Sequence, residues 1–239
     1  MKKEIEEKEK WDSLRQILKN SYAYNDSWNE AINLFESILQ TRYFNPLHDI
    51  IKEEKLEGEG FTIVTVQCAL IESLAAFRKG KIFNHKKEST SPQYEYSSSS
   101  KMFIDFLHSA SIFEDNFYRI DDTGKTIKNE PFSAEGFYTC VRCGLMHEAR
   151  TKGRWIINAT KNDVKNTPIF LEADGQNIKI LRTILHHRLE SYVQDYCSEL
   201  REDSQPGEVL RRYFARKLDH MFDISRNPRN QSYDWWEDR

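Results

Sequence analysis

Glycine and proline are scarce in this chain, which has nine Gly and six Pro among 239 residues. Because these two residues interrupt helices most strongly, their scarcity favours long helices. No uninterrupted apolar run approaches the roughly 20 residues that a membrane-spanning helix needs, so we expect no membrane partner. The first ten residues are mostly Lys and Glu and lack the apolar stretch of a signal peptide, which favours a cytoplasmic protein.

An excess of charge of one sign is also absent. The 35 Lys and Arg nearly balance the 38 Asp and Glu, and the formal net charge is −3. A protein that binds nucleic acid through its overall charge is therefore excluded, and any such site must be a local basic patch.

Cysteine is limited to four residues, Cys68, Cys140, Cys143 and Cys197, which we expect to be reduced in the cytoplasm. The pair Cys140-x-x-Cys143 followed by His147 is compatible with zinc. However, no second ligand pair stands at the spacing of a zinc finger, and the pair lies in an apolar helical pattern. We therefore expect small buried residues in a helix interface, with no metal and no other cofactor.

Helical periodicity extends over most of the chain, and two short runs rich in β-branched and aromatic residues interrupt it near residues 155 and 170. We predict an all-α fold, a multi-helix bundle with one small inserted β-hairpin. The expected helices cover residues 3–22, a segment capped by Asp26 or Ser27, a short piece from Asn45-Pro46, and residues 61–77, 101–113, 133–150, 177–200 and 207–222.

Composition divides the chain into three parts. We expect residues 1–57 to form an N-terminal helical extension packed on the core, residues 58–222 a helical domain, and residues 223–239 a polar tail whose Trp235 and Trp236 dock on the fold. Within the domain, the composition of the Ser-, Lys- and Tyr-rich segment 84–100 predicts a mobile loop. We expect residues 154–172 to form the hairpin. The tract 61–77 is apolar nearly all round, so its single acid, Glu72, needs a partner, which we expect to be a cation.

An Arg followed five to seven positions later by a His supplies the two side chains needed to cut a phosphodiester without a metal. Arg binds phosphate, and His transfers protons near neutral pH. Chance predicts roughly 1.4 such pairs here, so context must choose among those found. Arg142 and His147 share a helix with small residues that permit close approach of another backbone. The four pairs are Arg42/His48, Arg78/His85, Arg142/His147 and Arg182/His187.

The stretch Arg142-Cys-Gly-Leu-Met-His147 resembles the motif of the HEPN superfamily, small α-helical domains of bacterial toxins, abortive-infection proteins and RNA-processing enzymes. The likeness covers about residues 60–200. The apolar helix carrying Glu72 looks like the family's earlier core helix, which often directs a polar residue at the site. One position departs from the pattern, because the residue after the Arg is commonly Asn, Asp or another polar residue and here is Cys143.

The resemblance implies a metal-independent endoribonuclease acting as a homodimer in a toxin or defence context. His147 would serve as general base or acid on the ribose, and Arg142 would hold the scissile phosphate. Glu72 and Cys143 would support the pair, and Arg150 and Arg154, which share a face with His147 if the helix continues past Gly153, would follow the RNA backbone.

Two other classes of function remain open. One is a non-catalytic HEPN-like module that binds RNA or protein, for instance the partner of an antitoxin, and Cys143 favours it. The other is a helical interaction protein with no nucleic-acid role, which the near-neutral charge favours. Solvated surface charges explain Arg150 and Arg154 better than RNA contacts do.

Overall fold

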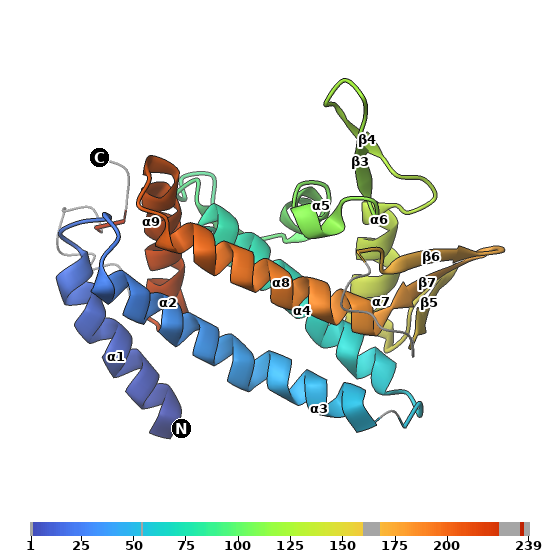
Figure 1. Cartoon of the computed structure of the whole chain (residues 1–239), viewed down its shortest axis with the longest axis horizontal. Helices are drawn as coiled ribbons and strands as arrows, with labels where there is room; N and C mark the ends of the chain where they lie inside the picture. Colours follow the sequence, from blue (N-terminus) through green and yellow to red (C-terminus); the bar gives the residue numbers. More distant parts are fainter. Residues whose placement is uncertain (1, 54, 160–167, 225–234, 237–239) are drawn as a thin grey trace. The chain divides into compact units, whose positions relative to one another are not determined.

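The computed structural model describes residues 2–53, 55–159, 168–224 and 235–236 and is mostly helical (Figure 1). Three small sheets accompany the helices, so the all-α expectation is corrected to a mostly helical fold with strands. The helices are α1 (Lys2–Leu18), α2 (Asp26–Leu39), α3 (Asn45–Glu53), α4 (Glu59–Lys79), α5 (Ser100–Leu107), α6 (Ala134–Gly136), α7 (Cys143–Glu148), α8 (Arg182–Arg201) and α9 (Gln205–Met221), with the π-helical segments η1 (Gln40–Phe44) and η3 (Phe137–Arg142) and the 3₁₀ turn η2 (Ser111–Phe113).

Some of the helix starts follow the expected capping chemistry. The Ser133 hydroxyl accepts a hydrogen bond from the Gly136 amide and caps α6, as the sequence predicts. The cap of α2 is one residue earlier than expected, because the side chain of Asn25 accepts from the Trp28 amide. Helix α5 ends at Leu107 rather than near residue 113, where the separate turn η2 follows.

The inserted β-structure differs from the predicted hairpin. Strands β5 (Trp155–Asn158), β6 (Leu171–Asp174) and β7 (Asn177–Leu181) form one sheet in the order β5-β7-β6. Strand β5 pairs in parallel with β7, and β6 pairs antiparallel with β7. The two runs expected to pair with each other therefore flank a third strand, which takes the residues predicted to begin a helix; α8 starts only at Arg182. Residues 160–167 of the expected hairpin lie outside the described residues.

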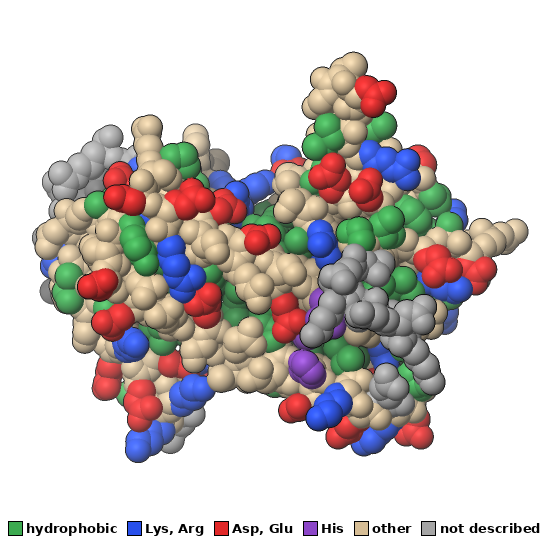
Figure 2. Space-filling model, in the orientation of Figure 1, with side chains coloured by type: hydrophobic (Ala, Val, Ile, Leu, Met, Phe, Trp, Pro, Cys, Tyr) green, Lys and Arg blue, Asp and Glu red, His purple; other side chains and the backbone are tan. Residues whose placement is uncertain are grey.

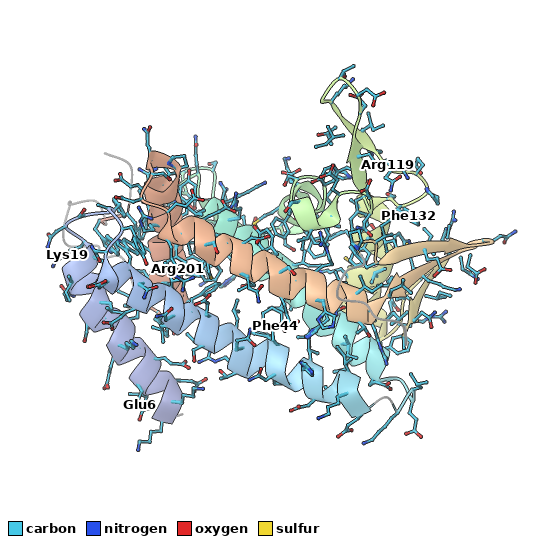
Figure 3. All side chains as sticks on the ribbon, viewed as in Figure 1. Glu6, Lys19, Phe44, Arg119, Phe132 and Arg201 are labelled. Atoms are coloured by element: carbon cyan, nitrogen blue, oxygen red, sulfur yellow. The ribbon has the colours of Figure 1, made fainter. Side chains whose placement is uncertain are left out.

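Two further strand pairs were not predicted. Strands β3 (Tyr118–Ile120) and β4 (Thr126–Lys128) form an antiparallel hairpin around Asp121–Gly124, where only a turn was expected. Strands β1 (Ile82–Phe83) and β2 (Glu95–Tyr96) pair in parallel. The second pair lies in part within the segment 84–100, which therefore has regular structure that its composition did not indicate. Figure 3 labels Arg119 on the β3–β4 hairpin.

The chain divides into two compact units, each made of segments distant in sequence. Unit 1 contains residues 1–40, 76–98 and 193–239, and unit 2 contains residues 41–75 and 99–192, so that α4 and α8 contribute residues to each. The sequence-based division was sequential, with boundaries after residues 57 and 222. Discontinuous units of this kind arise because long helices pack against partners far along the chain.

Aromatic rings dominate the core of each unit. In unit 1, Phe35 packs against Phe77 and Phe214 with ring centroids 4.6 and 5.3 Å apart. In unit 2, the rings of Phe113, Phe117 and Phe170 lie about 6 Å from one another, with centroid distances of 5.9, 6.0 and 5.9 Å. All six side chains are nearly inaccessible to solvent. Such clusters bury much apolar area and favour tilted geometries.

Helix α4 is the predicted apolar helix and extends two residues beyond the expected range at each end. Among the described residues it is the one helix long and apolar enough to cross a membrane by length and composition, a property not expected from its interrupted apolar run. Of its most apolar 18-residue window, 61% is buried inside the fold, which agrees with the core position that the sequence predicts.

The C-terminal Trp pair docks on unit 1, as expected. The indole N–H groups of Trp236 and Trp11 donate to the Asp219 carboxylate at 2.8 and 2.9 Å. Trp235 donates to the same carboxylate at 3.3 Å, and Arg15 forms an ion pair with it at 2.9 Å. Because Asp219 is 1% exposed, these donors replace the water that its charge would otherwise bind.

Candidate active site

The motif helix of unit 2 is built from three consecutive pieces. Helix α6 passes directly into the π-helical segment η3, which ends at Arg142, and α7 follows from Cys143 to Glu148. A π-helical turn inside an α-helix is uncommon and often marks a functional position. Helix α7 ends where Ala149 takes up a left-handed conformation with φ of 54°.

Arg142 lies against α4, where its Nη2 donates to Glu72 Oε2 at 2.9 Å. The two side chains are 19% and 22% exposed, and the guanidinium also lies 5.7 Å from the ring centroid of Tyr138. Burial opposes the charge of Arg142, but the hydrogen bond and attraction of Glu72 outweigh it and raise the pKa of Arg142. The cation expected beside Glu72 is therefore Arg142. Two of the predicted site residues are thus in direct contact.

Two cysteines border this ion pair. Cys68 on α4 is 2% exposed, and burial raises the pKa of its thiol to about 12, so it stays protonated. Cys143, which follows Arg142, is half-buried and forms no disulfide, as is the case for Cys140. Within the described ranges, no group of three or more His, Cys, Asp or Glu could hold a metal ion.

His147 is exposed in the last turn of α7, on a different face of the helix from Arg142. In the described part of the chain, no hydrogen bond or ion pair joins His147 to Arg142. Five residues in an α-helix turn through about 140°, which explains why Arg142 contacts α4 while His147 faces solvent. Within one chain, Arg142 and His147 therefore do not form a common site.

Arg150 and Arg154 do not share a helix face with His147, because α7 ends before them. Arg150 is exposed and its Nε donates to the Thr151 carbonyl at 3.3 Å. Arg154 is exposed next to β5, and its carbonyl accepts from the Ile178 amide at 2.8 Å. The conditional expectation that the helix continues past Gly153 is wrong, since the left-handed Ala149 ends it.

Gly144 accommodates its own chain. A Cβ atom at this position would lie 2.6 Å from the Arg150 carbonyl oxygen, which folds back over the end of α7. The small residue is thus explained by an approach within the chain, whereas the sequence argument invoked the approach of another backbone.

The pair Arg182/His187 occupies the first turns of α8. Arg182 Nη2 donates to Glu59 Oε1 at 2.9 Å, and Glu190 lies 3.0 Å from His187 Nδ1. Neighbouring His186 is 1% exposed beside Phe44, which Figure 3 labels, with ring centroids 5.8 Å apart. Burial, more than the charges around it, lowers the pKa of His186 to about 4, so His186 is neutral at pH 7.

Sequence reasoning missed the surroundings of Arg182. They include a cavity of about 360 Å³ lined by Gly58, Gly60, Phe61 and Arg182, among others. The sequence signal that points to this place is the pair of glycines, Gly58 and Gly60, at the start of the apolar helix. On the face shown in Figure 2, acidic and basic side chains are interspersed.

Comparison with known proteins adds no relative: no protein-family model, no curated protein and no solved structure matches this chain.

Proposed function

We propose that this protein is a metal-independent endoribonuclease of HEPN type, in which Arg142 holds the scissile phosphate and His147 transfers protons. The observation that carries the proposal is how Arg142 is held. Glu72 fixes the guanidinium through Nη2, while Nε and Nη1 have no hydrogen-bond partner among the described residues. A fixed cation with free N–H groups is suited to bind a phosphate without reorganisation.

His147 supplies the second half of the chemistry. Its side chain is exposed, and an imidazole can take the proton of a ribose 2′-hydroxyl or give one to the leaving 5′-oxygen. Attack by the 2′-hydroxyl on phosphorus breaks the bond to the 5′-oxygen and leaves a 2′,3′-cyclic phosphate. This reaction needs an acid, a base and charge stabilisation, and the residue types present meet those needs.

A homodimer completes the site in this proposal. Because Arg142 and His147 lie on different faces of one helix, a groove containing both requires the His147 of one protomer near the Arg142 of its partner. Light scattering should then give about twice the chain mass of 28.4 kDa at micromolar protein. A strict monomer at high concentration would exclude the composite groove.

The deciding experiment is cleavage of single-stranded RNA in the presence of EDTA. Wild-type protein should leave 2′,3′-cyclic phosphate ends and spare DNA, which has no 2′-hydroxyl. His147→Ala should lower the rate roughly 10²-fold or more. Arg142→Lys should retain little of the cleavage activity, because Lys lacks the planar pair of N–H donors with which Arg binds a phosphate. His187→Ala, which removes a half-buried His from another helical Arg/His pair, should keep the wild-type rate.

A non-catalytic HEPN-like module, for example one bound by an antitoxin, is the second candidate. The Arg142–Glu72 ion pair favours it, because an Arg neutralised by a carboxylate attracts phosphate less, and so does Cys143 in place of a polar residue. RNA that binds saturably but is never cut, under any tested condition, would decide for this candidate.

A further inference from the structure

The cavity at the start of α4 contains a buried guanidinium with unused donors. The Arg182 side chain is 6% exposed, and Nη2 is its one nitrogen that donates to a protein acceptor in the described parts of the chain. Its Nε is buried with no hydrogen-bond partner. Buried N–H groups of a charged side chain are seldom left unpaired, so this site calls for an acceptor that the described residues do not provide.

The backbone around Arg182 is shaped to leave that space open. A Cβ on Gly60 would lie 2.8 Å from Arg182 Nη1 and 2.9 Å from Ile157 Cγ2, so any larger residue there would have to displace these side-chain ends. Gly58 has a φ of 110°, a conformation that other residues rarely adopt. Both glycines line the cavity of about 360 Å³, which is large enough for a small organic ligand.

The dipole of α4 and the unpaired Nε–H of Arg182 favour an anion, while the Glu59 carboxylate offsets part of the Arg182 charge. Helix α4 has 21 residues and begins at Glu59, so the positive end of its dipole lies here. The Glu59 carboxylate is not free to fill the remaining donors, because the amides of Leu56 and Glu57 each donate to it at 2.8 Å. The hydrogen bond from Arg182 lowers the pKa of Glu59 to about 2, so the Glu59–Arg182 pair stays ionised.

An aromatic ring completes the lining. Phe61, in the first turn of α4, is 43% exposed although it lies in a largely apolar helix. Asn158, at the end of the edge strand β5, is exposed on the same cavity. A ring open to solvent beside an anion site suits a planar base, and an amide side chain suits its polar edge.

We propose that this cavity binds a nucleotide, with its phosphate monoester on Arg182 and the start of α4 and its base against Phe61. The inference does not rest on RNA cleavage at Arg142 and His147. A phosphate monoester with an attached base occurs both in free nucleotides and at the 5′ end of an RNA strand, and these two sources share the recognition chemistry described here.

Binding of adenosine 5′-monophosphate to the full chain, measured by calorimetry, tests the proposal. Saturable binding below millimolar concentration is expected, with much weaker binding of adenosine and competition by inorganic phosphate. No saturable binding at 10 mM, or equal binding of adenosine, would overturn it. Competition by a short RNA with a 5′-phosphate, but not by the same RNA with a 5′-hydroxyl, would assign the RNA end as the source; no competition by either would assign the free nucleotide.

Variants locate the site. Phe61→Ala should weaken binding roughly 5- to 150-fold, the range for loss of base stacking, and should fold because the ring is already open to solvent. Phe83→Ala, which removes a Phe that is 46% exposed in unit 1, is the matched control and should bind as wild type. Arg182→Lys should weaken binding at least tenfold. Equal effects of Phe61→Ala and Phe83→Ala would contradict the proposed location, whether or not Arg182→Lys folds.

Discussion

Arg142 and Glu72 are 70 residues apart in sequence and 2.9 Å apart in space, Nη2 to Oε2, with both side chains about one-fifth exposed. Replacing Glu72 by Gln should cost roughly 1–3 kcal/mol of unfolding free energy, because Arg142 then keeps a half-buried charge without its counter-ion. The same change should strengthen RNA binding, since the freed guanidinium attracts phosphate more. Urea unfolding and a filter-binding titration measure the two effects.

Glu135→Gln is the control for this prediction. Glu135 pairs with Lys128 at 3.0 Å, but those side chains are 47% and 63% exposed, and exposed pairs contribute little. Equal destabilisation by the two substitutions would mean that the Arg142–Glu72 pair is energetically an ordinary surface contact.

Gly144 should not tolerate alanine. The added Cβ would lie 2.6 Å from the backbone oxygen of Arg150, and overpacking of this kind costs roughly 1–3 kcal/mol. Gly136→Ala, earlier in the same helix, is the matched control. Its Cβ would meet nothing nearer than Ser133 Cβ at 3.4 Å, so it should leave stability unchanged or raise it by about 0.5–1 kcal/mol. Thermal unfolding followed by circular dichroism compares the two variants.

Acidification should destabilise unit 2 through His186. Its pKa is lowered to about 4 from 6.5, so its stabilising effect is complete above pH 6.5 and is lost as pH falls toward 4, where the unfolded chain binds a proton that the folded chain does not. The full effect is roughly 3 kcal/mol. Urea unfolding at pH 7 and pH 5 should show a smaller loss for His186→Leu than for wild type. His48, His187 and Glu190 remain in both proteins and cancel in that comparison.

The lengths of the hydrogen bonds to Asp219 predict how much stability each Trp substitution should cost. Trp236→Phe keeps a ring but removes the N–H that donates at 2.8 Å, so it should cost roughly 1–3 kcal/mol, the range for a lost partner of a buried charge. Trp235→Phe removes a longer bond of 3.3 Å and should cost less. An order of stability opposite to this one, in guanidinium unfolding, would mean that ring packing and not hydrogen bonding holds the two indoles.

Residue patterns were sufficient to predict the features that depend on local chemistry. The Ser133 cap, the core helix α4 and a cation beside Glu72 all follow from properties of single residues or short periodic runs. In contrast, β7 was misread as helix because Ile178, Ile180 and Leu181 fit a helical stripe continued by α8. The parallel pairing of β5 with β7 was also missed, since a four-residue strand carries no signal for its direction of pairing.

The candidate site was predictable in composition but not in geometry. Its Arg and His could be selected from the chain by spacing, yet the end of α7 at the left-handed Ala149 removed Arg150 and Arg154 from the expected face. Nothing in the local sequence marks Ala149 for this conformation, which Gly usually takes. The cavity at Arg182 likewise requires three segments brought together by the fold.

The tryptophans are distributed unevenly between the two units, so the two units contribute unequally to the intrinsic fluorescence. Of the five Trp, Trp155 is in unit 2 and the other four are in unit 1. Three of those four indoles donate to the Asp219 carboxylate. Intrinsic fluorescence will therefore report mainly on unit 1, and only a protein in which Trp155 is the sole indole would let the emission follow the unit that carries Arg142.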